Sequence, residues 1–333
     1  MRYLILNNTT PIHSVLASKI SLILANNKID NVSFSPKFNT KTAGAISFKK
    51  VLSIKPLFNS IFYFLKGFNN IILTSPAIYA LPAMILGRLF RNKVIYFLHE
   101  PNLTRNDIYS KMVNLYTKLV VKISTDVIVL SNFALTEAKN KFPSKNIFKI
   151  NYPAGIISDL RKKNKKYISF IGNLSDNKRL DLFIELAKKS NHQFLIAGSG
   201  NFKNYKKDII RYNIKFINKF LSQKEYDSLM QESLFVILPY ESSTQSAVLF
   251  DSFRNGTAVI TTDCGSFNEF VIQNETGYVF NINEFISSSL NVINESDLKN
   301  NNRLSNNCLN YFMNELSDFH FENKLINFLN TIK

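Results

Sequence analysis

The segment from Leu234 to Val271 constrains the fold more than any other part of the chain. It begins with the apolar run LFVILPY, passes through the small hydroxyl residues of ESST, and leads through QSAVLFDSFRNG into a second apolar run, TAVITTD. Two apolar strands joined by a helix are typical of an open α/β sheet, in which ligands bind outside the carboxyl ends of the strands. The sequence therefore predicts a ligand site where the first of these strands ends.

The start of this helix has the chemistry of an anion site. Ser243 or Thr244 is the expected N-cap, and the backbone N–H groups of the first turn would then face a ligand. Asp251 follows Thr244 by two helical turns, on nearly the same face and about 10 Å away. A phosphate at the helix start and a sugar hydroxyl at Asp251 would fit one nucleotide. The alternative is that the hydroxyl residues only cap the helix and that Asp251 faces solvent.

Length and composition allow two domains of ordinary size. The chain has 333 residues, of which 45% are hydrophobic, so it can bury sizeable cores without disulfides or metals. Cys264 and Cys308 follow neither metal-binding nor disulfide spacing. The opening MRYLILNN predicts a strand and not a signal peptide, and no run reaches the roughly 20 apolar residues of a membrane span. We expect a cytoplasmic protein.

The net charge of +17 predicts an anionic partner, which includes nucleic acid, an acidic membrane surface or a phosphorylated substrate. The charge is spread along the chain without a recognisable nucleic-acid module, which argues against nucleic acid. One basic segment is also aromatic and predicts either a contact with the inner face of the plasma membrane or a solvated basic face over an aromatic core. Its residues are Lys55, Phe58, Phe62, Phe64, Lys66 and Phe68.

The first half alternates short apolar runs with helical patterns, as βαβ units do. Strands are expected at 3–6, 71–74, 93–98 and 126–130, and helices at 11–26, 78–90 and 107–124. In the last of these helices, apolar residues at helical spacing predict one buried face, and three lysines lie on another. The apolar set is Ile108, Met112, Leu115, Leu119 and Ile123, and the lysines are Lys111, Lys118 and Lys122.

The second half repeats this alternation after a polar break. Residues 151–155 and the basic run RKKNKK at 161–166 lack periodicity, so we divide the chain into domains 1–155 and 156–333. Strands are expected at 167–171, 193–197, 214–217, 234–238 and 258–262, with helices at 180–190 and 223–232 and a helical last fifty residues. The last helix is expected to pack back on the first domain. Two doubly wound domains facing each other would create a ligand cleft.

At this point the residues resemble glycosyltransferase family 4. The resemblance is carried by FIGNLSDNKRLDLFIELA, FLIAGSG, ILPYESSTQSAVLFDSFRNGTAVITTDCGSFNEFV and ETGYVF, in this order, between 167 and 280. The first half matches more loosely, through FLHEPN, DVIVLSNF and KINYPAG. The resemblance implies the GT-B architecture, with two Rossmann-like domains facing across a cleft. It also implies a retaining enzyme that uses a nucleotide sugar.

The resemblance places the donor diphosphate against the loop after the strand at 167–171. Lys178 falls where the family has a lysine on the two phosphates, and Arg179 adjoins it; the alternative for Lys178 is a solvated loop lysine. Gly172 belongs to the same donor loop, and Asn173 stands where many members have an arginine. Gly198, in the next turn, is expected to serve the turn and not the phosphates.

Asp251 falls on the second acid of the family's E-x7-E motif, which holds ribose hydroxyls. The first acid would fall on Ser243, so this chain departs from the pattern, and Glu241 lies two residues too early. This departure leaves the donor sugar open. The small-residue loop resembles a variant found in part of the family, in which backbone amides approach the phosphate and sugar; its residues are Thr244, Gln245 and Ser246.

Three further positions are assigned by the resemblance. His99 aligns with a histidine that contacts the donor sugar from the first domain, with Glu100 beside it; a structural strand-end histidine is the alternative. His13 lies in the loop where the family often has a glycine-rich acceptor site, here NNTTPIH without glycine. Glu269 matches the acid of a PE pair near a helix start, where it either binds the donor or favours the helix dipole.

These assignments predict a hexosyltransferase that moves a sugar from a nucleoside diphosphate to a glycan hydroxyl with retained configuration. Catalytic roles are expected for Lys178, His99 and Glu241, and no metal is expected because Lys178 and helix amides can meet the leaving-group charge. The acceptor is expected to be a lipid-linked glycan of bacterial surface polysaccharide, such as O-antigen of lipopolysaccharide or capsule. The alternatives are a nucleotide-sugar epimerase or hydrolase and a non-enzymatic polyanion-binding or membrane-binding protein.

Overall fold

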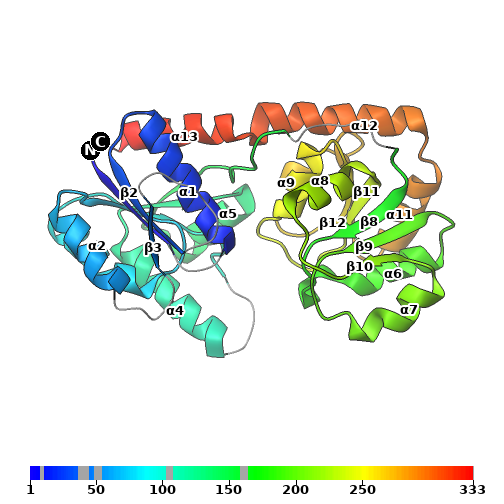
Figure 1. Ribbon diagram of the computed structural model, residues 1–333, viewed down its shortest axis with the longest axis horizontal. Helices are drawn as coiled ribbons and strands as arrows, with labels where there is room; N and C mark the ends of the chain where they lie inside the picture. The colour runs from blue at the N-terminus through cyan, green and yellow to red at the C-terminus, as the bar shows by residue number, and fades with distance from the viewer. Residues whose placement is uncertain (8–10, 37–44, 49–54, 103–107, 158–163, 333) are drawn as a thin grey trace. The chain divides into compact units, whose positions relative to one another are not determined.

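The computed structural model describes residues 1–7, 11–36, 45–48, 55–102, 108–157 and 164–332 (Figure 1). The chain divides into two compact units, Met1–Pro153 and Ala154–Lys333, which we call unit 1 and unit 2. Each unit contains one parallel β-sheet flanked by helices.

The described part of unit 1 forms a seven-stranded sheet in the order β3-β2-β1-β4-β5-β6-β7. The strands are β1 (Tyr3–Leu6), β2 (Asn31–Pro36), β3 (Ala45–Phe48), β4 (Asn70–Leu73), β5 (Val94–Phe97), β6 (Asp126–Val129) and β7 (Asn146–Lys149). The helices are α1 (Pro11–Asn26), α2 (Lys55–Leu65), the short η1 (Ile78–Ala80), α3 (Leu81–Leu89), α4 (Ile108–Ile123) and α5 (Asn132–Lys141).

Unit 2 forms a six-stranded sheet in the order β10-β9-β8-β11-β12-β13. The strands are β8 (Tyr167–Ile171), β9 (Gln193–Ala197), β10 (Lys215–Ile217), β11 (Ser233–Leu238), β12 (Ala258–Thr262) and β13 (Gly277–Phe280). The helical segments are η2 (Asp176–Lys178), α6 (Leu180–Lys188), η3 (Lys203–Tyr205), α7 (Lys206–Arg211), α8 (Gln223–Gln231), α9 (Ala247–Arg254), α10 (Phe267–Phe270), α11 (Phe285–Asn294), α12 (Leu298–Tyr311), the π-helical η4 (Phe312–Leu316) and α13 (Asp318–Thr331).

Both sheets are doubly wound, as expected from the sequence. All their strand pairs are parallel, and the strand order reverses between β1 and β4 in unit 1 and between β8 and β11 in unit 2. Such a reversal separates the loops at the carboxyl ends of two neighbouring strands and leaves a crevice there. The strands that flank both reversals are almost fully buried, because helices cover both faces of a parallel sheet.

The direction of winding decides which helices share a face. Crossovers between parallel strands are right-handed, so the direction in which the chain moves across the sheet decides the face on which the connecting helix lies. In the sheet of unit 1 (sheet 1), the chain moves from β1 toward the β3 edge through α1, which lies on one face. From β3 the chain moves toward the β7 edge through α2, α3, α4 and α5, which lie on the opposite face. Helices α2 and α4 lie on the same side of the sheet in Figure 1, and α3 packs against both of them.

The buried face of α4 differs from the one predicted. Met112, Leu115 and Leu119, expected in the core, are 66%, 70% and 45% exposed. The helix instead buries Thr117 and Val120 against the unit, because the Tyr116 hydroxyl donates to the Ala77 carbonyl at 2.7 Å and fixes the helix rotation. A second apolar face therefore remains on the surface.

The basic aromatic segment of the sequence is divided between core and surface. Phe64 is buried and Phe68 is half-buried against Tyr63, whereas Phe58 and Phe62 are exposed on α2. Buried and exposed aromatic side chains thus lie on different sides of α2, and the membrane contact stays a prediction. Within the described residues, no helix combines the length and apolar character needed to cross a bilayer.

Candidate functional site

Two glycines shape the end of β8, where the topology of unit 2 reverses. Gly172 follows the strand with φ +125°, and its N–H donates to the Ala197 carbonyl at 2.8 Å. A Cβ on Gly198, whose φ is +143°, would lie 2.0 Å from the Gly172 oxygen. Gly198 therefore serves the close packing of two turns, as expected, and gives the loop after β8 one fixed path.

Lys178 projects back to the end of β8. Its Nζ donates to the Asn173 carbonyl at 2.6 Å, lies 5.5 Å from the Tyr240 ring centre after β11, and would be 3.5 Å from a Cβ on Gly172. Burial lowers the pKa of the Lys178 ammonium to about 8, and no acidic side chain of the described residues forms an ion pair with it. An ammonium that is partly dehydrated and lacks a counter-ion favours an anionic ligand.

Arg179 has a local partner. It adopts a left-handed conformation with φ 44°, and its guanidinium forks onto Asp181, with Nη2 2.7 Å from Oδ2 and Nε 3.0 Å from Oδ1. Hydrogen bonding from Arg179 lowers the pKa of the Asp181 carboxyl. This pair fixes the entry into α6, so the role of Arg179 at the donor stays a prediction.

The loop after β11 is tied to both neighbouring loops. The Glu241 N–H donates to the Asn177 carbonyl at 2.8 Å, and Asn177 Nδ2 donates to the Ser242 carbonyl at 3.2 Å. On the other side, the Ser266 N–H donates to the Ser243 carbonyl at 3.0 Å. The carboxylate of Glu241 itself is exposed, and its proposed catalytic role is not tested by these contacts.

The cap of the site helix was predicted wrongly. Ser246, and not Ser243 or Thr244, is the N-cap of α9, and its Oγ accepts from the Leu249 N–H at 3.4 Å. Ser243 instead lies in the loop before the helix, where its carbonyl accepts from the Ser266 N–H, and the helix begins only at Ala247. Asp251 is therefore one turn beyond the first helical residue, Ala247, and not two turns beyond the cap.

Two buried polar atoms in this region have no partner among the described residues. They are the side-chain Nε2 of Gln245, in the loop before α9, and the Oγ of Ser266, at the start of α10. Buried donors without partners are costly, and a ligand with oxygen acceptors removes that cost. The Gln245 amide is thus a candidate donor to a phosphate or sugar oxygen.

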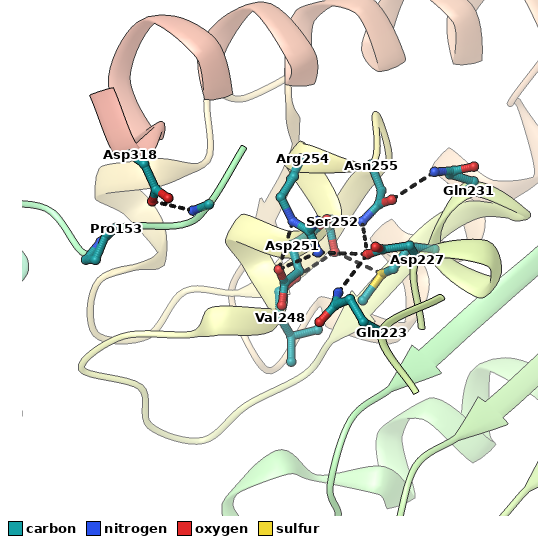
Figure 2. A network of polar contacts seen from close by, with 12 residues as sticks. Pro153, Gln223, Asp227, Gln231, Val248, Asp251, Ser252, Arg254, Asn255 and Asp318 are labelled. Carbon is teal, nitrogen blue, oxygen red and sulfur yellow. Dashed lines mark hydrogen bonds and ion pairs between the residues drawn. The ribbon is translucent and has the colours of Figure 1, made fainter. Parts of the chain in front are cut away.

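Asp251 belongs to a buried network that the sequence did not suggest (Figure 2). Arg254 Nη2 lies 2.7 Å from Asp227 Oδ1 and 3.1 Å from Asp251 Oδ1, and Asn255 Nδ2 lies 3.0 Å from the same Asp227 oxygen. The Asp251 side chain remains 26% exposed. Burial raises the pKa of Asp251, and Arg254 opposes that shift. Arg254 and the side-chain hydroxyl of Tyr226, which also hydrogen-bonds to this carboxylate, together orient Asp251.

The remaining assigned acid of unit 2 lies at the start of a single-turn helix. Glu269 is half-buried in the first turn of α10. This is the position in which an acid interacts favourably with the helix dipole, the alternative given for Glu269 from the sequence. Its negative charge also helps to raise the pKa of Tyr311 to about 12, behind burial and Glu315 as causes. Glu269 therefore faces α12 with at least part of its carboxylate, and its contact with the donor stays a prediction.

The assigned residues of unit 1 lie at the carboxyl edge of sheet 1. His99 follows β5, and its Nε2 lies 2.8 Å from the Thr74 carbonyl after β4. Because a carbonyl only accepts, Nε2 carries a proton in this contact. Glu100 is exposed beside it. His13 lies in the first turn of α1, and its side chain is outside the part of the chain that the structure describes.

The structure thus brings the donor residues together at the reversal point of sheet 2. Gly172, Asn173 and Lys178 come from the loop after β8, while Gln245 and Ser246 come from the loop after β11. The sequence reasoning missed Tyr240 and Asn177, which join the two loops, and Arg254, whose i,i+3 spacing from Asp251 was a usable signal. No group of three or more potential metal-binding side chains occurs among the described residues.

The carboxyl-terminal unit matches a known family model. Residues 156–309 match the family described as "Glycosyl transferases group 1", so the resemblance inferred from the sequence is confirmed. An uncharacterized glycosyltransferase of Methanocaldococcus jannaschii is 23% identical over 236 residues, which cover 66% of this chain and 65% of that protein. The chain thus spans slightly less than two thirds of the length of this relative.

Solved structures confirm the GT-B fold. HepE (Alr3699) of Anabaena, solved in complex with UDP, superposes with a TM-score of 0.72 at 16% identity, over 99% of this chain and 100% of that one. WaaB, named as a lipopolysaccharide outer core galactosyltransferase, gives a TM-score of 0.72 at 12% identity over 100% of both chains. The two Rossmann-like units are those of this architecture.

Proposed function

We propose that this chain, whose residues 156–309 match the model of the glycosyl transferases group 1 family, transfers a sugar from a nucleoside diphosphate sugar to a hydroxyl group of a glycan. The partly buried ammonium of Lys178 is the observation that carries the proposal. It lies at the reversal point of sheet 2 with a carbonyl and an aromatic ring as its contacts and without an acidic partner among the described residues. A diphosphate supplies the missing negative charge.

The neighbouring groups suit the rest of the donor. The start of α9 offers backbone N–H groups toward a phosphate, and Gln245 Nε2 is a buried donor in the same loop. The Asp251 carboxylate, which Arg254 and Tyr226 also contact, is assigned to a ribose hydroxyl. The UDP bound by HepE supports a nucleoside diphosphate as the leaving group.

The proposed transfer retains the anomeric configuration. The bond from the anomeric carbon to the diphosphate oxygen breaks, the acceptor hydroxyl oxygen bonds to that carbon from the same side, and the hydroxyl proton passes to the leaving diphosphate. Lys178 and the α9 amides stabilise the charge that grows on the leaving diphosphate. Cys264, the thiol nearest in sequence to this region, is unsuited to covalent catalysis because burial raises its pKa to about 11. Supporting catalytic roles are assigned to His99, by contact with the donor sugar, and to Glu241.

We propose that no divalent metal is required. The negative charge of the leaving diphosphate is assigned to Lys178 and to the backbone amides at the start of α9, in place of a metal ion. EDTA is therefore expected to leave donor binding and transfer unchanged.

The acceptor is proposed to be a lipid-linked glycan of a bacterial surface polysaccharide, such as O-antigen or capsule, used at the inner face of the plasma membrane. The net charge of +17 favours an anionic membrane surface. The likeness to WaaB, a lipopolysaccharide galactosyltransferase by name, supports this class of acceptor.

A binding panel and a transfer assay test the proposal. Thermal shifts are measured with UDP, GDP, dTDP and ADP, each with and without EDTA, and one diphosphate is expected to stabilise the protein in both conditions. The corresponding radiolabelled nucleotide sugar is then incubated with membrane extracts as the acceptor source. Label in a glycan product supports transfer, while label recovered only as an epimer or as free sugar would assign the site to epimerisation or hydrolysis.

A further inference from the structure

The outward face of α4 combines apolar and basic side chains. Met112, Leu115 and Leu119 are exposed along one side of the helix at i, i+3 and i+7 spacing. Lys111, Lys118 and Lys122 are exposed on or beside the same stripe. A surface helix normally has polar or charged residues on the face toward water. The three apolar side chains on this face therefore indicate that another surface covers it.

The exposed apolar surface continues onto the two neighbouring helices. Helix α2 exposes Phe58, Phe62 and Leu65, again at i, i+4 and i+7, and α3 exposes Ile85 and Leu89. Helix α3 packs against both α2 and α4, so the three helices form one layer on one face of sheet 1. We call this surface the α2–α4 layer. Contiguous apolar patches of this kind mark interaction sites on soluble proteins.

The charge on this layer has one sign. Helices α2, α3 and α4 contain no aspartate or glutamate at all. Cations crowd at its edge: burial lowers the pKa of Lys141 with the charge of Lys118 as a further cause, and burial together with Arg88 does the same to that of Lys145. An anionic surface relieves this repulsion.

We propose that the α2–α4 layer, centred on Met112, Leu115 and Leu119, is a docking surface for an anionic lipid bilayer. The inference rests on the proposed function, whose lipid-linked acceptor is presented at such a surface. The apolar side chains enter the boundary between headgroups and acyl chains, and the lysines beside them extend to the lipid phosphates. Phe62, with Lys66 Nζ 4.5 Å from its ring, repeats this arrangement on α2.

The charge pattern favours a bilayer over a second copy of this chain. A symmetric dimer through this layer would place the lysines of one copy near those of the other, without acids on the layer to pair with them. Nucleic acid would match the lysines but would leave eight large apolar side chains in water; they are Phe58, Phe62, Leu65, Ile85, Leu89, Met112, Leu115 and Leu119.

Vesicle binding tests the proposal on the full chain. Co-flotation is measured with vesicles of phosphatidylcholine containing 30% phosphatidylglycerol and with phosphatidylcholine alone, at about 0.1 and 0.5 M salt. The wild type is expected to bind only the anionic vesicles, and less at high salt. Met112→Gln/Leu115→Gln/Leu119→Gln is expected to bind at least tenfold more weakly. Lys111→Gln/Lys118→Gln/Lys122→Gln is expected to lose binding to a similar extent.

The matched control is Ile210→Gln/Phe220→Gln, which removes two apolar side chains of unit 2 that are 80% and 82% exposed. This variant should bind vesicles like the wild type; an equal loss would mean general stickiness and overturn the proposal. Two further outcomes would overturn the proposal. One is that both α4 variants bind the vesicles as strongly as the wild type does, and the other is that the wild type is a dimer and the apolar α4 variant is a monomer. The thermal shift by the nucleoside diphosphate, measured on every variant, shows that the donor site is folded. Its absence in the wild type would reject the donor site and leave the vesicle result standing.

Discussion

The first strands of the two sheets occupy equivalent places and end in different chemistry. Strand β1 is followed by Asn7, which is fully buried and accepts from the Ser75 hydroxyl at 2.8 Å, while its Nδ2 has no partner among the described residues. Strand β8 is followed by Gly172, which lies beside the partly buried ammonium of Lys178. The same strand order thus presents an uncharged amide in unit 1 and a cation in unit 2.

This difference indicates a division of labour. A dehydrated ammonium discriminates strongly for anions, whereas an amide donor suits a neutral oxygen. We propose that the reversal point of unit 2 takes the diphosphate of the donor and that the reversal point of unit 1 takes hydroxyl groups of a sugar.

The largest effect is expected from Lys178→Ala. Removing the cation should lower transfer by about a hundredfold, because the charge of the leaving diphosphate is then stabilised by amides alone. Initial rates with a labelled donor measure the loss. Asn7→Ala is the matched change in unit 1 and should leave affinity for the nucleoside diphosphate unchanged. An equal loss of nucleotide affinity in both variants would contradict the division between the units.

Asp251→Ala should lower kcat/KM by at least tenfold, or about 1.4 kcal/mol. The protein should stay folded because Arg254 keeps its ion pair with Asp227 at 2.7 Å. If Asp251 binds ribose, the variant loses affinity for the ribonucleoside diphosphate but not for its 2′,3′-dideoxy analogue, as measured by calorimetry. A parallel loss for both nucleotides would place Asp251 away from the ribose.

The affinity for the nucleoside diphosphate should depend on pH because burial lowers the pKa of Lys178 to about 8. An anion binds the protonated amine and raises its pKa, so affinity is highest below pH 8 and falls as the unliganded lysine loses its proton above it. Between pH 7 and 9 the dissociation constant should rise about tenfold. Lys178→Arg should flatten this profile; a wild-type profile that is already flat would show that Lys178 does not contact the ligand.

Continuous apolar runs in the sequence were sufficient to predict five of the six strands of unit 2, whereas β13 was not predicted. The expected bounds 167–171, 193–197 and 258–262 coincide with β8, β9 and β12, since strands buried on both faces contain few polar residues. Strand β2, with the sequence NVSFSP, was missed because its polar residues and terminal proline hide the pattern. The donor-loop positions came from the family resemblance, and their roles stay predictions.

Orientation and distant partners were not predictable. Helix α4 has two overlapping apolar stripes, and the contacts of its buried face are with distant residues, such as the hydrogen bonds between Tyr116 and Ala77, 39 residues away. The cap of α9 was wrong because Ser243 is held by Ser266, a contact between two loops. The ion pair between Asp227 and Arg254, which orients Asp251, likewise joins two helices and has no local signature.

The contact between Gly172 and Gly198 limits how this site can evolve. Since any side chain on Gly198 would strike the Gly172 carbonyl, the turn after β9 and the donor loop cannot drift apart by single substitutions. New sugar preferences must then arise elsewhere, in segments such as the loop before α9, while these two turns are inherited as a pair.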